Sequence, residues 1–592
     1  MTLIEDSFLD IPIDQNRPIK VICIGAGFSG ILCGIRLPQK VSNLDLTIYE
    51  KNEDFGGTWL ENKYPGVGCD VPSHSYQYTF AANPNWSKFY SSGAEILAYL
   101  QDTAWRYDVQ KYARFQHVFK GATWNDSTHK WTVKIHSLKS GETFEDSADV
   151  LIRGTGLLNK WKWPSIEGLH TFKGDLMHTA NFDPSFDWGD KRVALIGAGS
   201  TGIQILPHIQ PRAKEIFHYM RGKTWISPVG YGAEMGGGGN FEYSNEQRQQ
   251  FAQSPASYLA YRHKLEEVMN KSQLVSFRGT DIQKHFWVEA ERFMKEKLEK
   301  KPEIYQSLLP SFPPGCRRLT PGPGYLEALL QDNVQFIGSG VAKVDEKGIL
   351  DQLGNYHEVD AIICATGFDY TFNNKETPII GRDGISLDEM YNPYPQAYMG
   401  VAVPNMPNHF MFLGPASAPA SGSFIPTLEL VMDYIIKCIK KLQGESYSYM
   451  EPTIEALEAF NAQADKYFSR TVYTYKCSSF FKGDKDEGRV TTVWPGSATH
   501  YMKAVNNPRW EDFRYGLVPE AGGNPMAWLG NGMTMAQQNG EKTSSFLDEV
   551  DIPPAIHHYP VLANGLAKDE SAKTHTKSIS GVIESAISSL PA

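Results

Sequence analysis

The chain has 592 residues, of which 41% are hydrophobic and 21% charged, and its formal net charge is −10 at pH 7. A chain of this length has room for about two to four domains, and its composition is that of an ordinary folded protein. The acidic balance argues against nucleic acid as a partner, because binding phosphates requires a basic face. No apolar run reaches about 18 residues, so no membrane-spanning helix is predicted.

The acidic N-terminal segment lacks the pattern of a signal peptide, so we expect a cytoplasmic protein with no integral membrane association. The chain has seven cysteines, with neither a CxxC pair nor the spacing of metal ligands. An odd, dispersed set of this kind predicts reduced thiols and no metal site. The cysteines are Cys23, Cys33, Cys69, Cys316, Cys364, Cys438 and Cys477.

The first pattern that points to chemistry is an apolar run, VICI at 21–24, that leads into a GxGxxG sequence. Its glycines are Gly25, Gly27 and Gly30. A strand that ends in these glycines and opens a helix places helix N–H groups against a pyrophosphate. The next apolar run ends at Glu50, twenty residues past Gly30, where an acid accepts hydrogen bonds from an adenosine ribose. The sequence therefore predicts a dinucleotide site.

A second copy of this pattern runs from the apolar segment 193–196 into Gly197, Gly199 and Gly202. Its following strand, 216–220, ends at Arg221 and not at an acid, and Lys223 comes two residues later. A cation at this point matches a 2′-phosphate, so the pattern predicts NADPH rather than NADH. The alternative is a solvated basic strand end with no ligand.

Further motifs lie along the chain. The first consists of GGTW at 56–59, YPG at 64–66 and Asp70, and the second of Phe172, Gly174, His178 and Phe182. The segments GCRR at 315–318 and SFF at 479–481 come later. Together these motifs resemble those of one family, the Baeyer–Villiger monooxygenases, which are flavoproteins with two dinucleotide-binding domains. The family usually has GCKR in place of GCRR and tryptophan in place of Phe182 and Phe480. The resemblance covers about residues 17–530, and the segments 493–497 and 508–512 resemble fungal members.

The resemblance implies an α/β fold with two Rossmann-like dinucleotide-binding domains, the second inserted in the first, and a helical subdomain. The chain is expected to leave the first domain near 154–156 and to return near 365–369. The expected boundaries are 1–155 and 390–550 for the FAD-binding domain, 156–225 and 330–389 for the NADP-binding domain, 226–329 for the helical subdomain, and 551–592 for a C-terminal tail.

The resemblance also implies an enzyme that consumes NADPH and O2 and converts a ketone to an ester or lactone through a C4a-peroxyflavin. The expected partner is a small lipophilic ketone, either a cyclic ketone or a polyketide or terpenoid intermediate of secondary metabolism. Two alternatives use the same scaffold. One is a flavin-dependent N- or S-oxygenase, and the other is a non-oxygenating FAD/NADPH electron-transfer protein. The sequence does not reveal the oligomeric state.

The site residues follow from the motifs and from the resemblance. Arg318 is the expected catalytic residue, and Asp70 is expected to pair with it. The residues expected at FAD are Gly25, Gly27, Gly30, Glu50, Gly57, Thr58, Trp59, Asp70 and Tyr76. Those expected at NADPH are Gly68, Cys69, Asp70, Ala198, Gly199, Ser200, Thr201, Gly202, Gln204, Arg221, Gly222, Arg317, Arg318 and Phe480.

Three further features have two interpretations each. The glycine loop 236–239 is either a flexible surface loop or a lid over a substrate channel. Apolar residues at helical spacing within 579–590 predict a docked C-terminal helix, with a membrane-surface helix as the less favoured alternative. His178 is expected to be a structural residue near the hinge that couples domain motion and transfers no proton.

Overall fold

The structure is a computed structural model that divides into two units, residues 1–533 and residues 534–592. It describes residues 9–547 with the exception of 227–230, 233, 238, 373 and 484. In the second unit the described part contains α14 (Met535–Asn539) and a short 3-10 turn (Ser545–Leu547). The helix predicted within 579–590 lies outside the described residues, and so does Gly238 of the glycine loop.

The first sheet is parallel throughout, and its strands come from distant parts of the sequence. Its central strand has the sequence IKVICI and is buried along nearly its whole length, as expected for a parallel sheet covered on both faces. In spatial order the strands are β17 (His409–Met411), β7 (Val150–Arg153), β1 (Ile19–Ile24), β2 (Leu44–Tyr49) and β3 (Ala113–Arg114).

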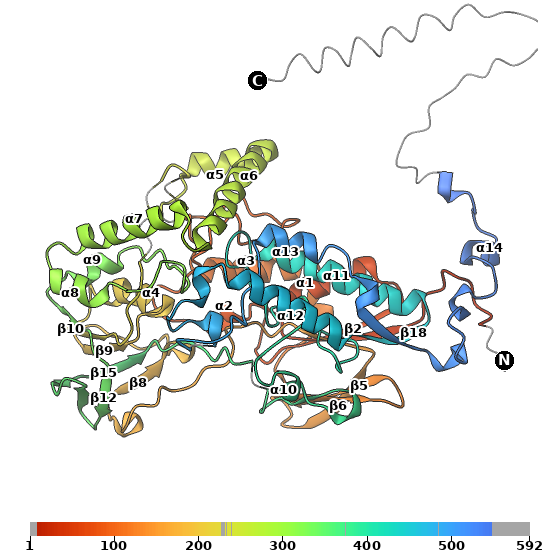
Figure 1. Cartoon of the computed structure of the whole chain (residues 1–592), viewed down its shortest axis with the longest axis horizontal. Helices are drawn as coiled ribbons and strands as arrows, with labels where there is room; N and C mark the ends of the chain where they lie inside the picture. The colour runs from red at the N-terminus through yellow and green to blue at the C-terminus, as the bar shows by residue number, and fades with distance from the viewer. Residues whose placement is uncertain are drawn as a thin grey trace, which may run out of the picture. The chain divides into compact units, whose positions relative to one another are not determined.

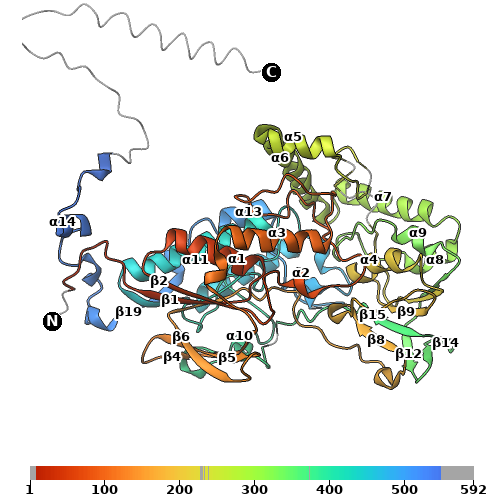
Figure 2. The ribbon, with the colours of Figure 1, turned by 180° about the vertical axis from the view of Figure 1, so that it is seen from behind.

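Alternate residues of β1 face two different cores. Val21 and Cys23 pack among helices on one face, whereas Ile22 and Ile24 pack on the other face against a smaller, mixed sheet. Figures 1 and 2 show these helices and this smaller sheet on opposite sides of the first sheet. The helices are α1 (Phe28–Lys40), α3 (Gly93–Arg106), α11 (Ile425–Gly444) and α13 (Ala498–Ala504). The smaller sheet has the order β16 (Ile379–Ile380), β4 (His117–Asn125), β5 (Lys130–Ser137) and β6 (Thr143–Ala148).

A second parallel sheet repeats the arrangement with residues from the middle of the chain, on the left in Figure 1. Its order is β11 (Val334–Ile337), β10 (Glu215–Tyr219), β9 (Arg192–Ile196), β15 (Ala361–Cys364) and β8 (Asp175–His178). The helices α4 (Ser200–Ile209) and α9 (Tyr325–Leu329) contribute apolar residues to one of its cores. An antiparallel ribbon borders it, made of β12 (Val341–Val344), β13 (Gly348–Asp351) and β14 (Tyr356–Glu358).

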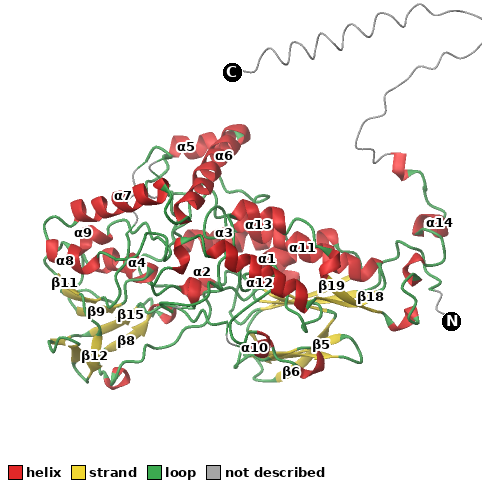
Figure 3. Cartoon of the chain, viewed as in Figure 1, coloured by secondary structure: helices red, strands yellow, loops and turns green. Residues whose placement is uncertain are grey.

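In the described part of the region where a helical subdomain was expected, four helices precede α9 (Figure 3). They are α5 (Asn245–Gln253), α6 (Pro255–Lys271), α7 (Asp281–Lys297) and α8 (Pro302–Leu308). Ser244, Ser254 and Thr280 cap the first three by accepting hydrogen bonds from backbone N–H groups of the first turns. The remaining elements are α2 (Thr58–Glu61), α10 (Leu387–Met390), β18 (Tyr447–Pro452), α12 (Ile454–Phe468) and β19 (Phe513–Leu517).

Two connecting segments join the parallel sheets. The chain leaves the first sheet after β7 and enters the second, and it returns after β15 to form β16 and β17. The segments pair with each other through an antiparallel bridge between Trp161 and Phe368, and Asp369 donates its N–H to the carbonyl of Lys160 at 2.7 Å. The fold class is therefore confirmed as two Rossmann-like domains with the second inserted in the first. The individual domain boundaries stay a prediction.

The structure corrects the expectation of reduced cysteines. Cys316 and Cys477 form a disulfide with a Cα–Cα distance of 6.6 Å, although 161 residues separate them in sequence. Their pairing depends on two loops that meet only in the folded chain, so the dispersed spacing gave no sign of it. The other five, in the described part of the chain, are free and buried: Cys23, Cys33, Cys69, Cys364 and Cys438.

Candidate functional site

One cavity of about 2160 Å³ connects the carboxyl ends of the central strands of both parallel sheets. Its wall includes the end of β1 with the first glycine turn, the end of β9 with the second, and parts of the segments 315–320 and 478–481. The carboxyl end of a parallel sheet is where such folds bind ligands. The predicted site residues come from widely separated stretches of sequence, and we describe them from the first turn outward.

Glycine is required at two positions of the first turn, once by the backbone conformation and once by lack of space for a side chain. Gly25 has φ +102, and a Cβ at Gly30 would overlap the carbonyl oxygen of Gly25. Glu50 lies beneath the turn, where its carboxylate accepts hydrogen bonds from the N–H of Ala26 at 2.6 Å and of Asn52 at 2.9 Å. Burial raises the pKa of Glu50, and these two N–H groups oppose that shift. Glu50 and Gly27 both line the cavity.

Aromatic side chains form the next part of the wall. Gly57 has φ +53 and precedes α2, which carries Thr58 and Trp59 into the cavity wall. The ring of Trp59 meets Tyr76 edge to face with centroids 5.7 Å apart, and Phe424 lies nearly parallel to Tyr76 at 6.3 Å. The indole N–H of Trp59 is buried and has no hydrogen-bond partner among the described residues. A donor left unpaired at an aromatic wall fits a flat ligand that carries acceptor atoms.

The second glycine turn differs from the first in leaving open space. A Cβ at Gly202 would overlap the carbonyl oxygen of Gly197, so glycine is required there by packing. A Cβ at Gly199 would meet no described atom within 4 Å, although Gly199 lines the cavity. That space matches the close approach of a pyrophosphate to a Rossmann turn. The hydroxyl of Ser200 lies 2.8 Å from that of Thr320, and Ala198 and Thr201 also line the wall.

Two arginines line the cavity near the end of β10, where a 2′-phosphate was expected. Arg221 follows β10, and Arg317 donates from Nη1 to the carbonyl of Lys223 at 2.9 Å. Gly222 also lines the cavity, and a Cβ at this position would lie 3.7 Å from Nη1 of Arg317. The amine of Lys223 points elsewhere and donates to the carbonyl of Gln306 at 3.3 Å. Two arginines suit a phosphate because each offers several N–H donors in one plane.

Arg318 and Asp70 form a two-pronged ion pair, although 248 residues separate them in sequence. Nε of Arg318 donates to one carboxylate oxygen at 2.9 Å and Nη2 donates to the other at 2.5 Å. The charge of Asp70 raises the pKa of Arg318 further, so the guanidinium is a permanent cation. The Arg318 side chain is 39% exposed, and this exposure is toward the cavity that it lines. Asp70 therefore fixes one edge of the guanidinium and leaves the other available.

Gln204 ties the loop that carries Asp70 to the second domain. Its side-chain amide donates to the carbonyl of Gly68 at 2.9 Å, and its oxygen accepts from the hydroxyl of Tyr64 at 2.7 Å. Burial raises the pKa of Tyr64 to about 12, so this hydroxyl keeps its proton and remains a donor. Burial also raises the pKa of the Cys69 thiol, which is thus a neutral wall residue and no nucleophile.

His178 lies at the end of β8 beside the returning connection. Its Nδ1 accepts from the N–H of Ala180 at 3.1 Å, so Nε2 carries the proton and donates to the hydroxyl of Thr366 at 3.1 Å. Burial lowers the pKa of His178 to about 4, which leaves the ring neutral at physiological pH. The ring stacks on Trp161 of the outgoing connection at 4.6 Å. This placement agrees with a structural residue near the hinge.

Phe480 projects into the cavity wall from a short 3-10 turn. Its ring packs against Tyr370 with centroids 5.0 Å apart. The sequence did not predict Tyr370 at the cavity, nor three further tyrosines that line it, Tyr90, Tyr231 and Tyr473. These residues lie in segments without a motif, so no sequence signal could have identified them.

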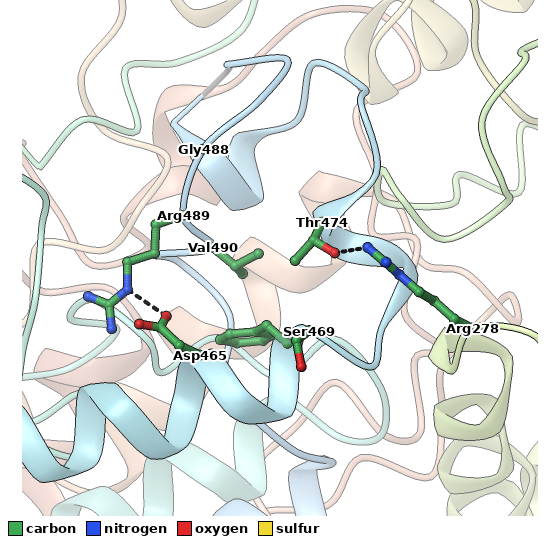
Figure 4. Close-up of a pocket in the computed structure, with 8 residues that line it drawn as sticks. Arg278, Asp465, Ser469, Thr474, Gly488, Arg489 and Val490 are labelled. Atoms are coloured by element: carbon green, nitrogen blue, oxygen red, sulfur yellow. Dashed lines mark hydrogen bonds and ion pairs between the residues drawn. The ribbon is translucent and has the colours of Figure 1, made fainter.

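A second, smaller cavity of about 340 Å³ opens on the surface beside α12 (Figure 4). Its charged side chains already have partners, since Arg489 pairs with Asp465 at 2.7 Å and Arg278 donates to Thr474. We assign it no ligand.

Among the helices in the described part of the chain, none has both the length and the apolar character that crossing a membrane requires. That part also contains no group of three or more potential metal ligands.

Comparisons with known proteins place these features in context. The flavin-binding monooxygenase-like (FMO-like) family matches residues 18–271. The FAD-binding monooxygenase moxY of Dothistroma septosporum is 38% identical over 89% of this chain and 84% of its own length. The FAD-binding monooxygenase stcW of Emericella nidulans is 36% identical over 92% and 89%. The NADP+-bound crystal structure of cyclohexanone monooxygenase from Rhodococcus sp. Phi1 covers 85% of this chain and 100% of that one, with a TM-score of 0.71 and 24% identity.

Proposed function

We propose that this chain, which belongs to the flavin-binding monooxygenase family, is a Baeyer–Villiger monooxygenase that uses FAD, NADPH and O2 to convert a lipophilic ketone to an ester or lactone. The observation that carries the proposal is the Arg318–Asp70 ion pair in the cavity that both glycine turns line. A fixed cation at this point suits an oxygen transfer in which negative charge develops on a carbonyl oxygen.

The residues on the wall fit the two cofactors. The first turn and Glu50 would hold the adenosine and pyrophosphate of FAD, and the unpaired indole N–H of Trp59 fits a flat ring with acceptor atoms. The open space at Gly199 would take the pyrophosphate of NADPH, with Arg221 and Arg317 at its 2′-phosphate. When bound, FAD reduced by NADPH would activate O2, of which one atom would be transferred to the substrate and the other released as water.

The chain's own contribution to the reaction is charge and orientation. The exposed edge of Arg318 would donate hydrogen bonds to the substrate oxygen as the carbonyl carbon becomes tetrahedral, so the negative charge forms beside a guanidinium that never loses its proton. At a distance of about 4 Å and an effective dielectric constant near 20, one such contact contributes about 4 kcal/mol. Felt only in the transition state, that energy corresponds to nearly three decades in rate. Asp70 holds the guanidinium plane in place.

Replacement of Arg318 tests the proposal. In Arg318→Ala we expect ester formation from ketones to fall about 100- to 1000-fold, because the developing negative charge loses its counter-charge, while purified protein keeps its FAD. The measurement is product analysis on linear, monocyclic and polycyclic ketones, together with the flavin absorbance of the purified variant. A wild-type rate of ester formation in this variant would remove Arg318 from the reaction.

Arg212→Ala is the matched control, because Arg212 pairs with Asp187 at the surface and its side chain is 58% exposed. That variant should form ester at the wild-type rate. Amines and sulfides belong in the same panel. If the wild-type protein oxygenates these and yields no ester from any ketone, the enzyme is an N- or S-oxygenase and the proposal fails.

A further inference from the structure

Residues 471–483, which we call the Phe480 segment, are bonded to residues 278 and 316, which are distant in sequence. The buried amine of Lys482 donates to the carbonyl of Tyr475 within the segment and to that of Asp486 just after it, both at 2.7 Å. Burial lowers the pKa of Lys482, and the two carbonyls satisfy its donors in compensation. These bonds set the internal shape of the segment.

The helical region holds one end of the Phe480 segment. Arg278, just before α7, donates from Nε to the carbonyl of Thr471 at 2.7 Å and also donates to the hydroxyl of Thr474. Figure 4 shows the hydrogen bond between Arg278 and Thr474 beside the small cavity. The guanidinium of Arg278 lies over the ring of Tyr475, 4.6 Å from its centroid. The carboxyl half of the segment is held by Thr492, whose hydroxyl donates to the carbonyl of Phe480 at 2.9 Å, and by an attachment to the segment 315–318.

The Cys316–Cys477 disulfide provides that attachment. Cys316 comes directly before Arg317 and Arg318, and Cys477 comes three residues before Phe480. Both cysteines are buried, with 0% and 4% of their surface exposed. The bond therefore joins the wall segment that carries both arginines to the wall segment that carries the aromatic ring. All three side chains line the same cavity.

We propose that the Cys316–Cys477 disulfide is a positioning element of the NADPH side of the site, which holds Phe480 and the Arg317–Arg318 pair in one fixed arrangement. The inference rests on the proposed function for its cofactor, but it concerns a covalent bond that the motifs do not predict. Forming the bond from two thiols releases two electrons and two protons, which O2 takes up as H2O2. A wall that is pre-formed by a covalent bond loses less conformational entropy when a ligand binds.

The first experiment establishes the bond in the purified full-length protein. Free thiols are blocked under denaturing, non-reducing conditions, the protein is digested, and the peptides are identified by mass spectrometry. We expect a linked pair of peptides that contain Cys316 and Cys477, with the other five cysteines blocked as thiols. Two blocked thiols at 316 and 477 would overturn the proposal, whatever the enzyme is found to catalyse.

The second experiment measures the consequence of losing the bond. In Cys316→Ala/Cys477→Ala we expect the Kd for NADP+, measured by calorimetry on the FAD-loaded protein, to rise about tenfold, which corresponds to about 1.4 kcal/mol. The fraction of consumed NADPH that appears as H2O2 should rise with it, while the FAD content stays at the wild-type level. Reduction of the wild-type protein with a phosphine, continued until thiol counting shows that the buried bond is open, should produce the same change, which keeps the test open if the double variant fails to fold.

Cys438→Ala is the control, since Cys438 is a buried free cysteine in α11 that does not line the cavity. It should leave the Kd for NADP+ and the H2O2 fraction unchanged. If the double variant and the reduced wild-type protein both bind NADP+ as tightly as the untreated protein, the disulfide has no positioning role. The binding and peptide measurements need no ketone, so they remain informative even if the proposed oxygenation fails.

Discussion

At the scale of single residues, the site depends on how its arginines are held. Arg318 has one edge fixed by Asp70, whereas Arg317 donates to the carbonyl of Lys223 and lines the same cavity as Arg221. Lys223, which the sequence offered as a second cation after β10, directs its amine away to Gln306. The two positive side chains in the segment 221–223 therefore differ in what they can contact, and this difference provides a matched pair of variants.

Arg221→Ala is expected to raise the KM for NADPH by about 10- to 100-fold and to change the KM for NADH by less than about twofold. The reason is that hydrogen bonds to a charged group contribute about 1.5–3 kcal/mol, and NADH has no 2′-phosphate to receive them. Steady-state kinetics with both cofactors measures the effect. Lys223→Ala should alter neither constant, and an equal change for NADPH and NADH in Arg221→Ala would place the 2′-phosphate elsewhere.

At the scale of elements, the two strand–turn–helix units are alike in sequence but not in the space they leave. Gly197 and Gly202 approach other backbone so closely that a side chain is excluded, whereas the position of a Cβ at Gly199 is open. Packing therefore requires glycine at two positions of this turn. At the third, Gly199 has φ −76, which any residue adopts, so neither packing nor backbone conformation requires glycine there. Only a ligand that occupies the open space would require it.

Gly199→Ala is therefore expected to fold with an unchanged melting temperature and full FAD content, yet to bind NADP+ more than about tenfold more weakly, because its methyl group fills the space that a pyrophosphate needs. Thermal unfolding and calorimetry separate the two effects. Gly202→Ala is the contrasting variant, since overlap with Gly197 should lower the melting temperature itself. Tight NADP+ binding by Gly199→Ala would mean that the pyrophosphate does not use this turn.

The sequence predicted these units well because strand, glycines and the first helical turn are contiguous, so one local pattern determines their geometry. It also brought Asp70 and Arg318 together, but only through resemblance to a family. Features created by tertiary proximity were not predictable in this way. The disulfide joins residues 161 positions apart, and Tyr90, Tyr231 and Tyr473 reach the cavity from segments without a motif.

At the scale of the whole inserted architecture, Gln204 is one of the side chains that bridge the two dinucleotide-binding domains. It belongs to α4 of the second domain and bonds to Tyr64 and Gly68 of the first. The loop that it holds continues directly into Asp70. The position of the ion pair relative to the second glycine turn thus depends on two neutral hydrogen bonds, each of which contributes about 1 kcal/mol.

Gln204→Leu removes both bonds at similar volume, and we expect flavin reduction by NADPH to slow about tenfold while FAD content is retained. Rapid mixing of the oxidised protein with NADPH under anaerobic conditions measures this rate. Gln210→Leu is the control, because Gln210 bonds to Asn333 within the second domain. It should leave the rate unchanged. A wild-type rate in Gln204→Leu would show that the contact between the domains does not govern hydride transfer.

The paired connections between the two parallel sheets have a mechanical consequence. Two short segments joined edge to edge by the Trp161–Phe368 bridge and the Asp369–Lys160 hydrogen bond resist stretching and in-plane shear, because either motion would break backbone bonds. They bend more easily in the direction perpendicular to their common plane, because this motion breaks neither the bridge nor the hydrogen bond. One domain should therefore swing relative to the other about essentially one axis. Rotation about one axis changes the distance between the two glycine turns in a single way. Opening for cofactor exchange and closing for reaction are then opposite directions of the same rotation.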